Sequence, residues 1–287
     1  MKAITAVGAT PQRMEVLYSI LREAGVEGEE RERLANLLGP PSLAKDQTDA
    51  GEDNALVDCL ALGHEMGLFR EESGRVALAR VDGPSSFLEL AGRQMVDQII
   101  SSVPTEGWVA GAIAWMLRQD PRSPLPWTGS GTATRLQSQL GSPPPFGMTN
   151  DSRVQQAVYW ARALGFVTRW NIVKAEVVVP DPTEAVSQRL DHVLLRGQQI
   201  TMPAFLAALG RTCPVLDGGS VHREVATRAG DTANPSKVSA SLSLALLRLK
   251  QRGELQFQYF DDAEVVEAEG LFGDGRVTHV SRRQVNA

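Results

Sequence analysis

Apolar residues recur at helical spacing in three segments of the chain, and each segment closes with a glycine. The segments cover residues 57–67, 154–165 and 242–253, and the closing glycines are Gly67, Gly165 and Gly253. Repeats of three and four residues put the apolar side chains on one face of a helix. A glycine at the end readily takes the left-handed conformation that stops a helix. The pattern therefore predicts three amphipathic helices with the same kind of ending.

A short β-rich stretch follows each of these helices. Residues 68–78 and 166–179 have the pattern of strand, tight turn and strand. In residues 255–266, β-branched and aromatic residues alternate with polar ones on both sides of Asp261-Asp262. This alternation around a turn is typical of a β-hairpin. We therefore expect a hairpin after each helix, with the third at 255–266.

Two shorter helical segments precede each of the three helices. The expected ranges are 12–24 with 30–38, 106–118 with 132–140, and 202–209 with 220–228. Thr105 and Thr201 are the expected N-caps of the first helix in the second and third sets. Three asparagines precede the closing helix of each set and are the expected caps there: Asn54, Asn150 and Asn234.

The repeated order of helix, helix, turn, helix and hairpin resembles the winged helix-turn-helix superfamily, used three times. The resemblance implies an α+β, mainly helical fold of three tandem winged-helix modules joined by connector helices. The expected parts are module 1 (residues 1–81), a connector helix (82–103), module 2 (104–182), a connector helix (183–196) and module 3 with a C-terminal tail (197–287). An unrelated α+β domain with a chance repetition is the alternative.

Composition favours a folded protein of the cytoplasm. Hydrophobic residues make up 43% of the 287 residues, which excludes disorder throughout the chain. No apolar run approaches the roughly 20 residues that cross a bilayer, so no membrane partner is expected. The two cysteines, Cys59 and Cys213, stand far apart among apolar neighbours, which indicates buried thiols in a reducing compartment. We therefore expect a cytoplasmic location.

Motifs that would carry catalysis are missing from the sequence. The four histidines are scattered, and no Cys-x-x-Cys pair, phosphate-binding Gly-Lys-Ser/Thr loop or Gly-x-Ser-x-Gly elbow occurs. Acidic groups at 46–53 and 261–264 lie in a loop and in the expected hairpin and are interpreted as solvated surface. The sequence therefore predicts a non-enzymatic protein with no catalytic residue, metal, cofactor or small-molecule substrate.

Charge is distributed unevenly along the chain. The formal net charge is −5, but residues 1–80 hold 9 basic and 14 acidic groups, whereas residues 197–260 hold 7 and 4. Binding to nucleic acid depends on neutralising phosphates with Lys and Arg. We therefore expect contact with double-stranded DNA through module 3 and, to a smaller extent, module 2, but not through module 1.

The candidate contact residues follow from how winged helices dock. The third helix enters the major groove, and the wing lies on the backbone or in the adjacent groove. In module 3 the basic and small hydroxyl residues in this region are Ser236, Lys237, Ser239, Ser241, Arg248, Lys250 and Arg252. Module 2 contributes Arg153 on its helix and Lys174 near its wing, and it also holds Arg162 and Arg169. Trp127, in a Pro-rich loop, is the expected exposed anchor for a protein partner.

The length, the three-module layout and the lack of active-site motifs are similar to DpdG-type accessory proteins. These belong to bacterial anti-phage clusters that insert 7-deazaguanine derivatives into DNA. The resemblance implies a subunit of a multi-protein defence complex, working on DNA with partners such as a helicase or a nuclease. No motif matches residue by residue, so the resemblance assigns no functional residue. A protein–protein scaffold without DNA contact and a transcriptional regulator are the alternatives.

Overall fold

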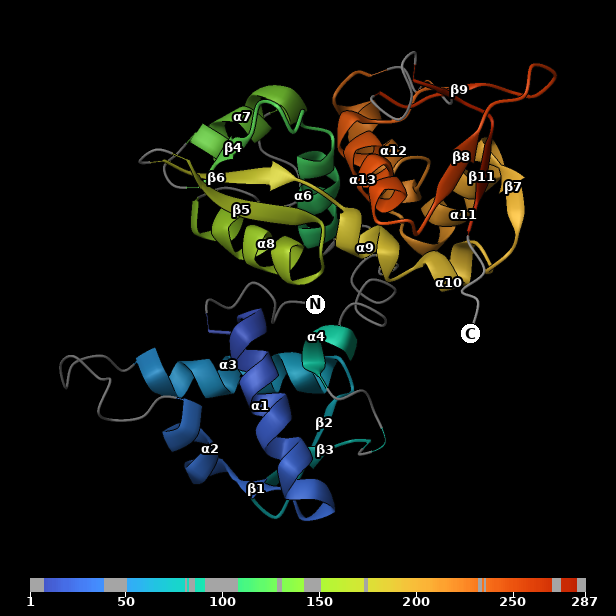
Figure 1. Ribbon diagram of the computed structural model, residues 1–287. Coiled ribbons are helices and arrows are strands. Elements are labelled where there is room, and N and C mark those ends of the chain that lie inside the picture. Colours follow the sequence, from blue (N-terminus) through green and yellow to red (C-terminus); the bar gives the residue numbers. More distant parts are fainter. Residues whose placement is uncertain are drawn as a thin grey trace. The chain divides into compact units, whose positions relative to one another are not determined.

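The computed structural model divides the chain into two compact units, Met1–Gln98 (unit 1) and Ile99–Ala287 (unit 2). It describes residues 8–38, 51–80, 82, 86–90, 108–127, 131–141, 151–172, 175–231, 234, 236–269 and 275–282. Both units combine helices with small antiparallel sheets, so the fold is α+β (Figure 1). Among the described residues, no helix is long and apolar enough to cross a membrane.

Unit 1 has its helices on one small sheet. Its elements are α1 (Pro11–Ala24), η2 (Gly25–Glu27), β1 (Glu29–Glu30), α2 (Arg31–Leu38), α3 (Gly51–Glu65), β2 (Phe69–Glu72), β3 (Arg75–Leu78) and α4 (Phe87–Leu90). The strands lie in the order β1-β3-β2. Helix α1 begins where Thr10 Oγ1 accepts the N–H of Arg13, and it buries Met14, Leu17 and Leu21 in the core. The expected helices and hairpin of module 1 are confirmed.

Module 2 has the same order of elements within unit 2. They are α6 (Trp108–Leu117), β4 (Leu125–Pro126), α7 (Gly131–Leu140), α8 (Asp151–Ala163), β5 (Val167–Ile172) and β6 (Ala175–Pro180). The strand order β4-β6-β5 matches β1-β3-β2, because a short strand after the first helix pairs with the second strand of the hairpin. The sequence pattern did not predict β4, whose Leu125 is fully buried.

Module 3 keeps the three helices but changes the sheet. Its elements are β7 (Gln199–Thr201), α11 (Met202–Thr212), α12 (Ser220–Arg228), α13 (Ala240–Gln251), β8 (Gln256–Gln258), β9 (Val266–Glu267), β10 (Arg276–Val277) and β11 (His279–Ser281). The sheet has the order β7-β11-β8, and β9 pairs with β10. The expected hairpin over 255–266 is therefore wrong.

Thr278 explains why the chain returns later than expected. This buried residue donates its N–H to the carbonyl of Gln258 at 3.0 Å, and its Oγ1 accepts the N–H of Phe260 at 2.9 Å. The Asp261-Asp262 turn lies between β8 and β9, in an excursion rather than at the tip of a tight hairpin. The residues that the sequence assigned to a tail thus supply the return strand β11.

The glycine endings of the three long helices are confirmed. Gly67, Gly165 and Gly253 have φ values of 66°, 78° and 75°. In all three copies the glycine N–H donates to the carbonyl three residues earlier, and the next N–H donates to the carbonyl five residues earlier. This is the paired hydrogen bonding of a left-handed C-terminal cap.

The expected N-caps are only partly correct. Thr201 caps α11 by accepting the N–H of Ala204, as expected. Asn54 lies inside α3, so its expected capping role is wrong. Asn234 accepts the N–H of Ser236 in a turn, and Ser239 is the residue that caps α13. The caps expected at Thr105 and Asn150 lie outside the described residues.

The segment after module 2 is not one connector helix. It forms α9 (Thr183–Ser187) and α10 (Leu190–Val193), with a break at Gln188 and Arg189. Helix α9 packs against α13. The buried Arg189 donates to the carbonyl of Ala185, and its guanidinium lies 5.7 Å from the centre of the Phe166 ring. A connector helix was also expected over 82–103. Within the described residues of that range, the structure forms the short helix α4.

Helix α6 belongs to the cores of two modules at once. It packs against α8 of module 2 and against α12 of module 3, and Figure 1 shows it between those elements. Trp115 and Ile113 of this helix are almost completely buried. Modules 2 and 3 therefore share apolar packing, which is why they form a single compact unit.

Both cysteines are buried and neither forms a disulfide, as expected. The Cys59 thiol lies 3.7 Å from the carbonyl oxygen of Gly8, to which it donates. Burial raises the pKa of Cys59 to about 12. Because the thiolate is the reactive form, this side chain acts as a core residue.

Replacing Gly165 with alanine should cost much more stability than the same change at Gly253. A methyl group on either glycine meets the left-handed penalty of about 1 kcal/mol. On Gly165 it would also lie 2.8 Å from Cβ of Glu184 and 2.9 Å from the nitrogen of Ala185, whereas on Gly253 it meets no atom within 4 Å. We expect losses of about 3 and 1 kcal/mol in the free energy of unfolding, measured by urea denaturation. Equal losses at the two positions would contradict the close packing of α9.

Candidate nucleic-acid interface

The C-terminal end of α13 is tied to module 2 by a buried carboxylate. Arg248 forms an ion pair with Asp181, the residue that follows β6. The side chain of Asp181 is only 2% exposed, and it also accepts the N–H of Thr183 at 3.3 Å. Removing a carboxylate from water requires such partners. Arg248 therefore has a structural partner as well as an exposed part.

Arg252 lies one turn beyond Arg248 on the same face of α13, since positions four apart are neighbours on a helix. It pairs with Glu184 at 2.7 Å and with Glu254 at 3.8 Å. The hydrogen bond that Arg252 donates to Glu184 raises the pKa of Arg252. Lys250, two residues from each arginine, faces a different side of the helix.

These two arginines line a groove together with two arginines of module 2. The groove has a volume of about 410 Å³, and we call it the arginine groove. Its lining residues are Arg162, Gly165, Val167, Thr168, Arg169, Trp170, Asp181, Thr183, Glu184, Arg248 and Arg252. Four guanidinium groups and two carboxylates line the groove, and Arg169 and Arg252 also pair with Glu176 and Glu254, which are not part of the lining. Guanidinium groups that keep an exposed part favour an anionic ligand.

Arg162 and Arg169 enter the groove from α8 and β5. Arg162 is exposed in the last turn of α8 and forms no ion pair among the described residues. Arg169 pairs with Glu176, and its guanidinium stacks 4.2 Å from the centre of the Trp127 ring. Arg162 is therefore the guanidinium of the groove whose charge is least neutralised by carboxylates of the protein.

Trp127 is not the exposed anchor that its loop sequence indicated. Its side chain is 9% exposed, and its ring meets that of Tyr159 edge-on at 5.2 Å. Together with the stacked Arg169, these contacts make Trp127 part of the packing between β4, α8 and β5. The expectation of an exposed side chain was wrong because loop composition does not reveal a partner on a distant helix.

The N-terminal end of α13 is also tied to module 2. Ser241 is 1% exposed, and its hydroxyl donates to the carbonyl of Leu117, the last residue of α6. Helix ends leave such carbonyls without an intrahelical partner. The hydroxyl of Ser239 caps α13 and donates to Asp217 at 2.9 Å. Both hydroxyl groups are therefore engaged in holding the fold.

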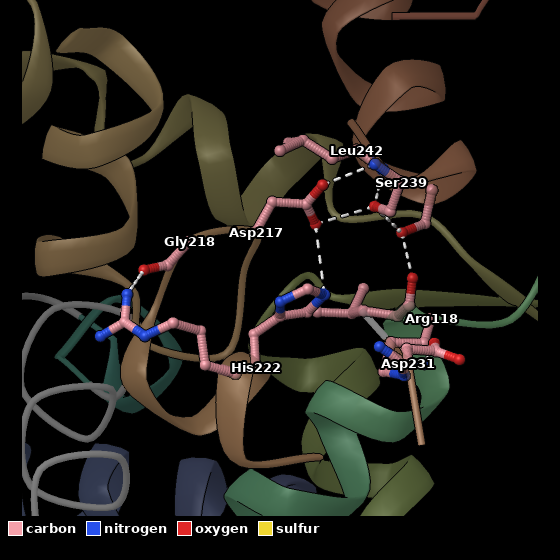
Figure 2. Close-up of polar contacts among 10 residues, drawn as sticks. Arg118, Asp217, Gly218, His222, Asp231, Ser239 and Leu242 are labelled. Carbon is pink, nitrogen blue, oxygen red and sulfur yellow. Dashed lines mark hydrogen bonds and ion pairs between the residues drawn. The ribbon is translucent and has the colours of Figure 1, made fainter. Parts of the chain in front are cut away.

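Asp217 is the centre of this second polar cluster (Figure 2). It accepts the N–H and the hydroxyl of Ser239, and its carboxylate lies 3.7 Å from Nε2 of His222. Burial lowers the pKa of His222 more strongly than Asp217 raises it. Nearby, Arg118 pairs with Asp231, which is a further link from α6 to module 3.

Ser236 and Lys237 lie beside this cluster rather than in the arginine groove. Lys237 is exposed and lines a separate cavity of about 690 Å³, which Asp217, His222 and Ser239 also line. Helix α13 has 12 residues and so separates its two ends by about 18 Å. The structure therefore divides the module 3 candidates between two sites and does not assemble them into one face.

Of the module 2 candidates, Arg162 and Arg169 line the groove and Arg153 does not. Arg153 is exposed in the first turn of α8, nine residues before Arg162. Nine residues turn a helix by about two and a half turns, which puts the two side chains on opposite faces. Lys174 lies outside the described residues.

Sequence reasoning missed Trp170, Asp181 and Glu184 as parts of the groove. The available signal was the spacing of Arg248 and Arg252, which places them on one helix face. Asp181 and Glu184, which pair with these arginines, lie about 70 positions earlier, where the local pattern holds no information about them.

Replacing Asp181 with asparagine should destabilise unit 2, whereas Glu184→Gln should not. The first change removes a buried charge that Arg248 and Thr183 both contact, and we expect a loss of about 2 kcal/mol in the free energy of unfolding. Glu184 is 55% exposed, so the loss there should stay within about 0.5 kcal/mol. Urea denaturation of both variants is the measurement. Equal effects would mean that the Asp181 pair does not hold α13.

A comparison with protein families identifies the chain more closely than the groove does. A family model described as DpdG-like matches residues 1–263. The match spans both units and ends just before β9. No curated protein matches the chain, and no solved structure does. Because the match covers most of the 287 residues, the chain belongs to the DpdG-like family.

Proposed function

We propose that this protein is a non-enzymatic DNA-binding adaptor built of winged-helix modules. It acts with other proteins, such as a helicase or a nuclease, in a bacterial defence complex. Membership in the DpdG-like family suggests a role in a DNA-modification or defence cluster. The arginine groove is the observation that supports contact with DNA, because guanidinium groups are suited to phosphates and the exposed Arg162 forms no ion pair among the described residues.

The arrangement of modules 1 and 2 favours the winged-helix assignment. Each has a helix, a short strand, two helices and a hairpin, with the short strand beside the second hairpin strand. This is the order expected of a winged helix-turn-helix. Module 3 departs from it, because β7 precedes the first helix and the return strand β11 comes late. We treat module 3 as a modified copy.

DNA contact is assigned to the arginine groove and not to the N-terminal half of α13. Ser241, Leu242 and Ser243 of that half are buried. A recognition helix has to present its side chains to base edges in the major groove. Because α13 is fixed against module 2, phosphate contacts by arginines at its other end are the mode that the geometry supports.

Unit 1 is assigned to protein contacts. Glu23, Glu27, Glu32, Glu65 and Glu72 are exposed on it and would repel phosphates. Asp58, another acidic group of α3, accepts the N–H of Gly8 at 3.0 Å. Exposed Val16 and Val26 add apolar surface near these charges. A polar rim with apolar positions is typical of a transient protein interface.

One cluster among the described residues has the composition of a catalytic triad, with a serine, a histidine and an aspartate. We favour a structural role for it. Ser239 and His222 both contact Asp217. In a hydrolytic triad the histidine has to take the proton of the serine, with the aspartate on its other nitrogen. Here the carboxylate stands between the other two groups, which supports a non-enzymatic function.

Charge reversal at Arg162 should weaken binding to DNA. We expect Arg162→Glu to raise the dissociation constant of a labelled 20-base-pair duplex about tenfold and to reduce its salt dependence by about one counterion. Fluorescence anisotropy at two salt concentrations measures both. Arg211→Glu is the matched control, since Arg211 is an exposed arginine of α11 that does not line the groove.

The control should bind as the unmodified protein does. Equal weakening by both variants would point to a general charge effect and would remove the groove from the proposal. An unmodified protein with no salt-sensitive binding to any DNA would make a pure protein–protein scaffold the better explanation.

A further inference from the structure

Trp170 is an exposed aromatic residue on the wall of the arginine groove. Its side chain is 53% exposed, whereas Trp115, Trp127 and Trp160 are buried. Burying a large aromatic surface is favourable, so a tryptophan left in water at this level is uncommon. Ile172, two residues along the same strand, is 51% exposed. Side chains two apart on a strand share one face, so the pair forms an apolar strip on β5.

The indole N–H of Trp170 is bonded to a side chain of the same strand. Its N–H donates to Oγ1 of Thr168 at 2.9 Å, on the same face of β5. This bond satisfies the single polar group of the ring. What remains for a ligand is the apolar ring surface. This bond also favours one orientation of the ring, which lowers the conformational freedom lost when something stacks on it.

The cations beside this ring select the kind of ligand. Arg162, Arg169, Arg248 and Arg252 line the same groove as Trp170. Guanidinium groups that follow a backbone, next to an aromatic ring on which bases stack, are the combination used by proteins that bind single-stranded nucleic acid. In a continuous duplex the faces of the bases are covered by neighbouring base pairs, and only their edges are accessible in the grooves.

We propose that Trp170 is a stacking platform for an unpaired nucleobase and that the arginine groove takes single-stranded DNA in preference to continuous duplex. This inference rests on the proposed DNA-binding function. The position of α13 supports it independently, because both ends of this helix are bound to module 2 through Ser241 and Arg248. This disfavours major-groove reading of a duplex by the N-terminal half of α13, where Ser241, Leu242 and Ser243 are buried, while Arg248 at the other end keeps an exposed part.

The test compares a labelled 20-nucleotide oligo(dT) with a 20-base-pair duplex, using the full chain. We expect the unmodified protein to bind oligo(dT) more tightly than the duplex. Trp170→Ala should raise the dissociation constant for oligo(dT) about tenfold and leave that for the duplex nearly unchanged. Trp170→Phe, which keeps an aromatic ring, should retain most of the affinity. Tyr259→Ala is the matched control, since Tyr259 is exposed but lies outside the groove.

A second measurement uses the fluorescence of the ring itself. Stacking of thymine on Trp170 should quench the tryptophan emission when oligo(dT) is added, and Trp170→Phe should lose most of this quenching. The comparison stays informative even where Trp170→Ala folds poorly, because the phenylalanine variant keeps the size and shape of the strip.

The outcomes separate this inference from the proposed function. Salt-sensitive binding in which the duplex is bound as tightly as oligo(dT), with Trp170→Ala unchanged, overturns the stacking platform but leaves DNA binding intact. Absence of salt-sensitive binding to both ligands overturns the proposed function as well. Tighter binding of oligo(dT) that is insensitive to both Trp170 variants also overturns the inference, because the preference then arises elsewhere.

Discussion

Helix α13 is fixed at both ends by groups that belong to the preceding module, and the rest of unit 2 follows from this. At one end Ser241 satisfies the last carbonyl of α6, and at the other Arg248 neutralises the buried Asp181. Each contact removes a cost of burial, an unpaired carbonyl in one case and an unpaired carboxylate in the other. Helix α13 is therefore held against module 2, and its arginines line one groove with those of α8 and β5.

Features that depend on a few adjacent residues were predictable from the sequence. The three glycine endings were correct because a left-handed residue closes its hydrogen bonds within five positions of itself. The cap at Thr201 was correct for the same reason. The hairpins of modules 1 and 2 were correct because both strands and the turn lie in one short stretch.

Features that depend on distant partners were not predictable in this way. Ser239 rather than Asn234 caps α13, because Asp217 holds the Ser239 backbone and hydroxyl at that position. The third hairpin was misplaced because β11 has only three residues and lies beyond β9 and β10 in the chain, and buried Thr278 fixes its register. For the candidate site, the sequence supplied the arginines of the groove but neither their carboxylate partners nor the exposure of Trp170.

The sharing of α6 between two cores has a consequence for how such a protein can change over evolutionary time. A helix that packs against α8 on one side and α12 on the other cannot be altered to suit one neighbour alone. An exchange of module 3 for a foreign copy would leave the carbonyl of Leu117 and the carboxylate of Asp181 without partners, unless the newcomer carried a hydroxyl and a guanidinium at matching positions. We therefore expect modules 2 and 3 to be exchanged only together, whereas unit 1 forms a compact unit of its own.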